Sequence, residues 1–175
     1  MVLMKDLIAD LDFFPYPLRV YFSENGVSKC TFVESIEFLL SESELSQGET
    51  KIITSVKDWV NSYTAGNFSS PIPLLDYRKV TDFRKTIYNN LAEVKPGSRI
   101  TYAELAKISG SPKASRAVGS AMAANQFVPI IPCHRVVKSD GGLGNYSGLG
   151  GIKTKQLLLS FENQASTDVK EDAST

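Results

Sequence analysis

The chain has 175 residues, of which 42% are hydrophobic and 22% are charged, and its formal net charge at pH 7 is zero. This composition supports a sizeable hydrophobic core in one large or two small domains. No apolar run approaches the roughly 20 residues of a membrane span, and residues 1–10 lack the features of a secretory signal, so we expect neither a membrane partner nor secretion.

The chain contains two cysteines, Cys30 and Cys133, and one histidine, His134. These are too few for a disulfide framework or for a zinc site built from cysteine and histidine ligands. We therefore expect no bound metal and a reducing compartment, the cytoplasm or, in a eukaryote, the nucleus.

The neutral total hides an uneven distribution of charge. Residues 1–77 carry 5 Lys and Arg against 11 Asp and Glu, a net charge of −6, whereas residues 78–162 carry 13 against 5, a net charge of +8. The last thirteen residues, 163–175, carry 1 against 3, a net charge of −2. The basic second part favours a polyanion such as nucleic acid as its partner, and the alternative is a solvated basic face on an enzyme of small molecules.

The first elements in chain order predict a small α/β domain over residues 1–76. Residues 18–35 predict a β-hairpin, because two β-rich runs flank a turn signal at Asn25-Gly26. Residues 51–66 have apolar side chains at helical spacing and end at a glycine, which predicts a helix. Residues 71–77 are typical of a short strand or an extended linker.

The next elements predict a mostly helical domain over residues 77–163. Thr81 can cap a helix that ends near Leu91, and TYAE, which starts at Thr101, is a capping box that begins another helix. Ser111-Pro112 is expected to start the following helix, which ends near Ala124. Two short helices joined by a glycine-containing turn are compatible with a helix-turn-helix or with a plain helical hairpin.

The helix expected over residues 113–125 consists mostly of small side chains, which allow close approach to another helix or to a nucleic-acid groove. Arg116 is its only charge after Lys113. A guanidinium in such surroundings suits contact with phosphate or insertion into a base stack.

The end of the chain contains a loop, a helix and a polar tail. Residues 141–151 include six glycines and predict a loop that can close over a ligand, and residues 152–162 predict a final helix. Residues 164–175 are polar and are expected to form a disordered tail.

Cys133 and His134 are adjacent in the apolar stretch IIPCHRVV. A cysteine attacks as a thiolate and needs a neighbouring base or cation, and His134 is the obvious base, although adjacent side chains in an extended segment point to opposite faces. Glu162, Asp140 and Glu104 are candidates for orienting the imidazole, and spacing alone does not choose among them. The alternative is that Cys133 is a small core residue, which is our expectation for Cys30.

The residues from about Tyr77 to Glu162 carry a family resemblance. Pro-Cys-His-Arg-Val, preceded by Ile-Ile and followed by Gly-Asn-Tyr-Ser-Gly, closely resembles the O6-alkylguanine-DNA alkyltransferases, as do ITYAELA and PKASRAVGSAM. The resemblance implies a ribonuclease-H-like α/β domain with a small antiparallel sheet and a helix, then a helical domain whose helix-turn-helix enters the minor groove of double-stranded DNA. It further implies a monomer without a cofactor that flips O6-alkylguanine out of the duplex and transfers the alkyl group irreversibly to its own cysteine, in a single turnover.

The resemblance also implies roles for individual residues. Cys133 would accept the alkyl group, His134 would take its proton through a water, Glu162 would orient His134, and Tyr102 would donate to the leaving guanine. Arg116 would take the place of the flipped base, and Asn125 would link the recognition helix to the active-site segment. Further DNA contacts would come from Lys113, Ala114, Ser115, Tyr102 and Arg135, and the base pocket would include Val136, Asn145, Tyr146 and Ser147.

Two other functions compete with this prediction. One is a catalytically silent lesion sensor of the alkyltransferase-like type, in which another residue occupies the acceptor position, so the presence of Cys133 argues against it. The other is a cysteine hydrolase of a small amide or ester, which would leave Arg116 and the basic charge of residues 78–162 unexplained.

Overall fold

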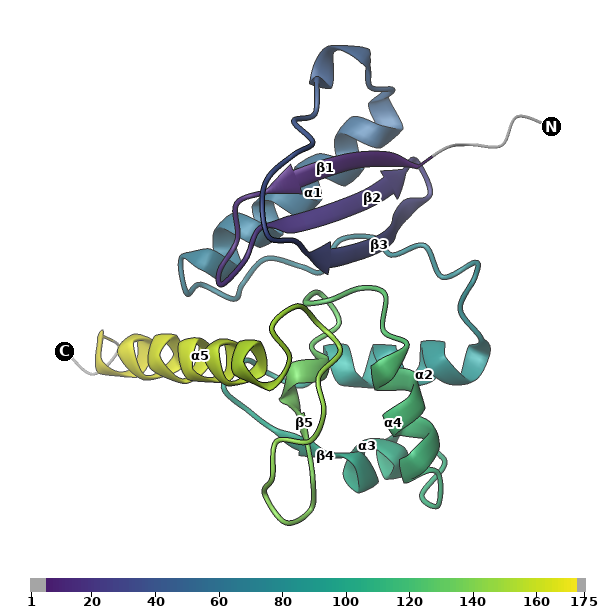
Figure 1. The fold of residues 1–175 in the computed structure, drawn as a ribbon, viewed down its shortest axis with the longest axis vertical. Coiled ribbons are helices and arrows are strands. Elements are labelled where there is room, and N and C mark those ends of the chain that lie inside the picture. The colour runs from purple at the N-terminus through teal and green to yellow at the C-terminus, as the bar shows by residue number, and fades with distance from the viewer. Residues whose placement is uncertain (1–5, 173–175) are drawn as a thin grey trace. The chain divides into compact units, whose positions relative to one another are not determined.

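The computed structural model describes residues 6–172 and divides the chain into two compact units (Figure 1). Unit 1 comprises the chain up to Lys79 together with Gln126–Ile130, and unit 2 comprises Val80–Asn125 and the chain from Ile131 onward. The predicted division into an N-terminal α/β part and a mostly helical C-terminal part is confirmed.

Unit 1 is built on an antiparallel sheet of three strands in the order β1-β2-β3: Leu7–Leu11, Leu18–Ser23 and Gly26–Phe32. The hairpin predicted over residues 18–35 is present, but its two-residue turn consists of Glu24 and Asn25, and Gly26 opens β3 with φ of +118°. A side chain at Gly26 would also lie 2.6 Å from the Leu74 carbonyl oxygen, so glycine is required there. Strand β1 was not predicted, because LIADL is short and has no turn signal of its own.

Helix α1 (Gln47–Thr64) starts at a capping box formed by Ser46 and Glu49, four residues before the predicted start. Its buried face carries Trp59 and Tyr63, and the Phe13 ring lies 5.8 Å from Trp59 and 5.1 Å from Tyr63. These aromatic rings form one end of the unit 1 core. The short 3₁₀ helix η1 (Glu42–Glu44) precedes α1.

A buried ion pair fixes the chain beside β1 and β2. Arg19 donates two 2.8 Å hydrogen bonds to the Asp10 carboxylate, whose side chain is fully buried. The same carboxylate accepts from the backbone N–H groups of Glu37 and Phe38 at 2.7 and 3.0 Å. Together with Arg19, these groups hold the pKa of Asp10 below its ordinary value even though burial acts to raise it.

Residues Gln126–Ile130 are the part of unit 1 that is distant in sequence. The Cys30 N–H donates to the Gln126 carbonyl at 2.7 Å, and Phe127 forms an isolated parallel bridge with Cys30. Phe127 is fully buried, with its ring 5.4 Å from that of Tyr77. Cys30 is 1% exposed in this core, as the sequence predicts.

Unit 2 contains four helices and a two-stranded parallel sheet, β4 (Ile100–Thr101) and β5 (Val136–Val137). Helix α2 (Asp82–Ala92) is capped by Thr81, and α3 (Tyr102–Ile108) begins at the predicted capping box of Thr101 and Glu104. The predicted start of α4 is wrong: the helix spans Ser115–Ala123, and Ser111 accepts from the Ala114 N–H in a separate turn before it. The short 3₁₀ helix η2 (Cys133–Arg135) precedes β5.

Helix α5 (Ile152–Asp172) is longer than the helix predicted over residues 152–162. It continues through most of the expected disordered tail, because no glycine or proline follows Ile152; residues 173–175 lie outside the described part of the chain. Ile152 and Leu157 are exposed. The buried positions within residues 152–166 are Thr154, Lys155, Leu158, Leu159 and Glu162.

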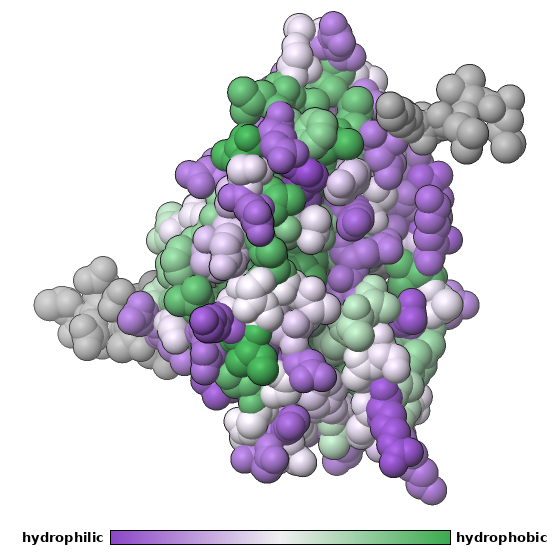
Figure 2. Space-filling model, viewed as in Figure 1, coloured by the Kyte–Doolittle hydropathy of each residue, from purple (hydrophilic) through white to green (hydrophobic). Residues whose placement is uncertain are grey.

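Hydrophilic and hydrophobic residues are interspersed over the face of the protein drawn in Figure 2. None of the helices within residues 6–172 combines the length and the apolar character needed to cross a bilayer.

Candidate active site

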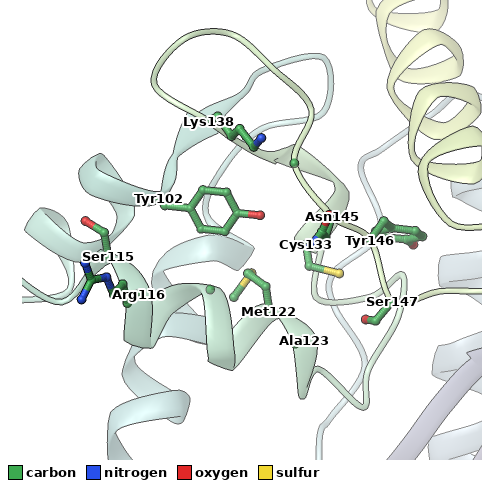
Figure 3. A pocket seen from close by; sticks show the side chains of 12 residues that line it. Tyr102, Ser115, Arg116, Met122, Ala123, Cys133, Lys138, Asn145, Tyr146 and Ser147 are labelled. Carbon is green, nitrogen blue, oxygen red and sulfur yellow. The ribbon is translucent and has the colours of Figure 1, made fainter.

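A pocket of about 580 Å³ lies in unit 2 among the start of α3, one side of α4, the start of η2 and the glycine-rich loop (Figure 3). It is lined by a cysteine, by two tyrosines and by the cationic side chains of an arginine and a lysine. Its lining residues are Tyr102, Ser115, Arg116, Gly119, Met122, Ala123, Cys133, Lys138, Gly144, Asn145, Tyr146 and Ser147.

Cys133 lines this pocket although its residue is only 4% exposed. It opens the 3₁₀ turn η2, in which the Arg135 N–H donates to the Pro132 carbonyl at 2.9 Å. The segment before the turn is tied to the end of α4, because Asn125 Nδ2 donates to the Ile131 carbonyl at 2.8 Å. Cys133 and His134 therefore lie on a turn, and the alternation of an extended strand does not apply to them.

Glu162 contacts the histidine. Its Oε1 lies 2.8 Å from His134 Nε2, and both side chains are fully buried. The other two candidates are engaged elsewhere: Glu104 accepts from Thr101 in the capping box, and Asp140 accepts from the Gly142 N–H. The structure thus resolves the choice that spacing left open.

The same carboxylate binds Arg135, whose Nη2 and Nε donate to Glu162 at 2.7 and 3.1 Å and whose Nη1 donates to the Val94 carbonyl at 2.5 Å. Arg135 is 6% exposed, so the prediction that it contacts DNA is wrong. A guanidinium that is buried and bonded to a carboxylate is not available to a phosphate.

Opposing effects set the ionisation of His134 and Glu162. Burial acts to raise the pKa of Glu162, but His134 and Arg135 outweigh it and hold that pKa far below its ordinary value. Burial lowers the pKa of His134 against the attraction of Glu162. The ionised carboxylate only accepts hydrogen bonds, so neutral His134 carries its proton on Nε2 and presents a lone pair at Nδ1. Nδ1 is buried and has no hydrogen-bond partner among residues 6–166.

Burial raises the pKa of the Cys133 thiol. A hydrogen bond from the Asn125 side chain and the positive charge of Lys155 act in the opposite direction. The resting thiol therefore needs a base before it can attack.

Tyr102 and Arg116 occupy different sides of the pocket. In Figure 3 the Tyr102 hydroxyl points toward the side that carries Cys133, and Ser115 and Arg116 lie at the opposite side, at the start of α4. Burial raises the pKa of Tyr102, and the Cys133 charge adds to this effect, so the phenol remains a donor at neutral pH. Arg116 is exposed and is thus free to meet a large ligand.

Only some of the residues predicted for the base pocket and for DNA contact line the pocket. Asn145, Tyr146 and Ser147 line the pocket, whereas Val136 is fully buried and its carbonyl accepts a hydrogen bond from Lys155. Lys113 is exposed and Ala114 is the N-cap of α4; neither belongs to the lining.

The sequence did not predict a place in or beside the site for three residues: Lys138 and Met122, which line the pocket, and Lys155, which binds the Val136 carbonyl. The signal for Lys155 was available, since residues 155, 158, 159 and 162 follow the i, i+3, i+4, i+7 pattern of a buried helix face. A lysine at such a position is rarely fully buried unless it has a partner. No comparable signal identifies Lys138 or Met122.

Known proteins resemble the chain in sequence and in structure. A family model described as 6-O-methylguanine DNA methyltransferase, DNA binding domain, matches residues 82–164. The methylated-DNA–protein-cysteine methyltransferase of Rattus norvegicus is 38% identical over 122 residues, which are 66% of this chain and 58% of that protein. The chain thus spans less than two thirds of the length of this curated relative.

Two crystal structures from Mycobacterium tuberculosis are similar over most of their length. The O6-methylguanine methyltransferase is 29% identical with a TM-score of 0.73, covering 91% of this chain and 94% of that one. The structure described as OGT in complex with DNA is also 29% identical with a TM-score of 0.73, covering 90% and 93%.

Proposed function

We propose that the chain is a member of the O6-alkylguanine-DNA alkyltransferase family and that it repairs O6-alkylguanine in DNA by transferring the alkyl group to its own Cys133. The observation that carries the proposal is a buried Cys133 thiol that lines a pocket and is followed directly by the His134–Glu162 pair. A lesion sensor would not need this thiol.

The chemical step requires the proton of the thiol to leave first. His134 Nδ1 takes it through a water, and Glu162 stabilises the imidazolium that forms. The Cys133 sulfur then forms a bond to the alkyl carbon while the bond from that carbon to guanine O6 breaks, and the electron pair stays on the guanine. The product is a thioether, and the protein acts once.

The leaving guanine needs hydrogen-bond donors, because negative charge develops on it. Tyr102 and Ser147 line the pocket with hydroxyl groups, and we assign them this role. The pocket contains no group placed to hydrolyse a thioether, so no turnover is expected.

Duplex DNA is the proposed partner, bound through its minor groove by a helix-turn-helix formed by α3 and α4. Arg116, which is exposed at the rim of the pocket, would fill the place of the flipped base, with Lys113, Ala114 and Ser115 beside it. The net charge of +8 over residues 78–162 and the DNA complex of the M. tuberculosis protein support this assignment. DNA affinity should consequently fall steeply with salt.

The finer structural assignments also belong to this proposal. Unit 1 would be a ribonuclease-H-like domain, with domain limits at residues 76 and 163, and Asn125 would link α4 to the active-site turn. The protein would act as a monomer, without metal or cofactor, in the cytoplasm or the nucleus.

The test is incubation with a duplex that contains O6-methylguanine, followed by mass spectrometry of the peptide that contains Cys133. We expect one methyl group per protein on Cys133, none in Cys133→Ser, and full transfer in the matched Cys30→Ser control. DNA binding without methylation would indicate the sensor, and repeated turnover of a small ester would indicate the hydrolase.

A further inference from the structure

Lys155 is a fully buried lysine in the first turn of α5. Its Nζ donates to the Val136 carbonyl at 2.6 Å, and no carboxylate within residues 6–166 lies within ion-pairing distance of it. Burial of an ammonium group without a counter-charge is unfavourable, and the positive end of the helix dipole adds to this. Stability alone therefore does not account for a lysine here.

Helix α5 contacts η2, and the titratable groups outside α5 that interact electrostatically with Lys155 belong to two other segments of unit 2. Cys133 and His134 belong to η2, and Arg99 directly precedes β4. Burial lowers the pKa of Lys155 to about 8; a Cys133 thiolate raises it and Arg99 lowers it. At pH 7 most molecules therefore carry a protonated Lys155, and Cys133 is the group on these segments that can supply a negative charge.

We propose that Lys155 is a positioning residue for Cys133, whose buried ammonium stabilises the attacking thiolate while its hydrogen bond to Val136 fixes the chain that follows the active-site turn. This inference rests on the alkyl transfer proposed above. Lys155 keeps its own proton throughout, since the thiol proton goes to His134. No carboxylate among residues 6–166 balances its positive charge while Cys133 is a thiol, and the charge gains a counter-charge when Cys133 ionises.

The carbonyl of Val136 explains how the ammonium is held in place. It immediately follows η2 and begins β5, which pairs with β4 through Ile100. A lysine is a flexible four-carbon chain, and a single strong acceptor restricts it to one position. The hydrogen bond thus fixes the charge relative to the turn that carries Cys133.

The test measures the thiol pKa of Cys133 without DNA, from the pH dependence of its alkylation by iodoacetamide in a Cys30→Ser background. Lys155→Met is expected to raise that pKa by about one unit, which lowers the thiolate fraction at pH 7 about tenfold. Methyl transfer at pH 7 should slow to a similar degree and should approach the rate of the parent protein at alkaline pH. A purely structural lysine would reduce transfer equally at all pH values and leave the thiol pKa unchanged, and this result would overturn the proposal.

Two further variants separate the charge from its surroundings. Lys155→Gln keeps a neutral N–H donor and should raise the thiol pKa as Lys155→Met does; a parent-like value would contradict the role of the charge. Lys155→Gln also serves if Lys155→Met does not fold. Lys153→Met removes an exposed lysine from the same helical turn and should leave the thiol pKa unchanged. Because iodoacetamide needs neither DNA nor a modified base, a failure of methyl transfer in the parent protein would reject the proposed function without deciding this one.

Discussion

The two units each bury charged side chains, but they treat those charges differently. In unit 1, Asp10 and Arg19 meet in a bidentate pair, and each favours the charged form of the other. In unit 2, burial lowers the pKa of His134 and of Lys155 and raises that of Cys133, so each of these groups is shifted toward its neutral form. Glu162 is the exception, because His134 and Arg135 both hydrogen-bond to its carboxylate and favour the charged form.

The difference distinguishes a structural ion pair from a site that moves protons. The Asp10–Arg19 pair gains nothing from a change of ionisation, because every charge is already compensated. In the unit 2 cluster the Lys155 ammonium has no nearby counter-charge while Cys133 is a thiol, and under the proposed mechanism it gains one when the Cys133 proton moves to His134. The arrangement of charge therefore supports the assignment of the proposed chemistry to unit 2.

The largest expected effect comes from Glu162→Gln. The amide cannot compensate the imidazolium charge, and we expect methyl transfer to slow by about 100-fold or more, the range of general-base contributions. The measurement is single-turnover transfer from a methylated duplex. The matched control is Asp10→Asn, which removes a buried carboxylate charge from unit 1 and should leave the rate per folded molecule within about twofold. An equal loss in both variants would remove the distinction between the two clusters.

Asp10→Ala should lower the free energy of unfolding by roughly 2 kcal/mol. The reason is that the Glu37 and Phe38 N–H groups and the Arg19 guanidinium lose their acceptor. Urea denaturation followed by circular dichroism measures the change. Glu37→Ala, which removes the exposed partner of Arg19, should cost much less. Equal losses would show that the buried carboxylate has no special part in the fold.

The smallest effect concerns the pH dependence of stability, which should have two separate windows. The folded-state pKa of His134 is lowered, so the unfolded chain binds more protons below its ordinary value of about 6.5, and the free energy of unfolding falls as pH drops through that region. The pKa of Asp10 is also lowered, so its stabilisation persists to lower pH and is lost below about 3.9.

Denaturation at a series of pH values tests both windows. His134→Gln should flatten the curve just below about pH 6.5 and leave the acid window intact. Asp10→Asn should leave the His134 window intact and weaken the acid window, to which Glu162 also contributes. A curve that His134→Gln does not alter would contradict the buried neutral state of the imidazole.

Local signals in the sequence predicted much of the fold. Thr81 and Thr101 cap α2 and α3 as expected, because a cap depends only on residues within one turn. The start of α4 was wrong, since Pro112 suits the first turn of a helix and equally suits the separate turn that it occupies. Which residues of α5 are buried depends on what packs against the helix, and its own sequence does not reveal this.

The site was predictable as a set of residues but not as a set of contacts. Cys133 and His134 stand out by rarity, yet Glu162 is 28 residues from His134 and two other carboxylates were equally eligible. Arg135 was assigned to DNA because it follows the pair in a basic region, but the 3₁₀ turn directs it to Glu162 and Val94. Such choices depend on tertiary packing, which a linear pattern does not encode.

The five residues Gln126–Ile130 have a consequence for any attempt to shorten the protein. They lie between α4 and Cys133 in the sequence, yet their backbone and apolar side chains belong to the unit that contains the three-stranded sheet. Deletion up to Lys79 would remove strand β3, with which Gln126 and Phe127 pair. The remaining fragment would expose the apolar side chains of this segment to solvent, shortly before Cys133, and would be prone to aggregate. Unit 2 is therefore expected to remain soluble on its own only if these five residues are redesigned with polar side chains.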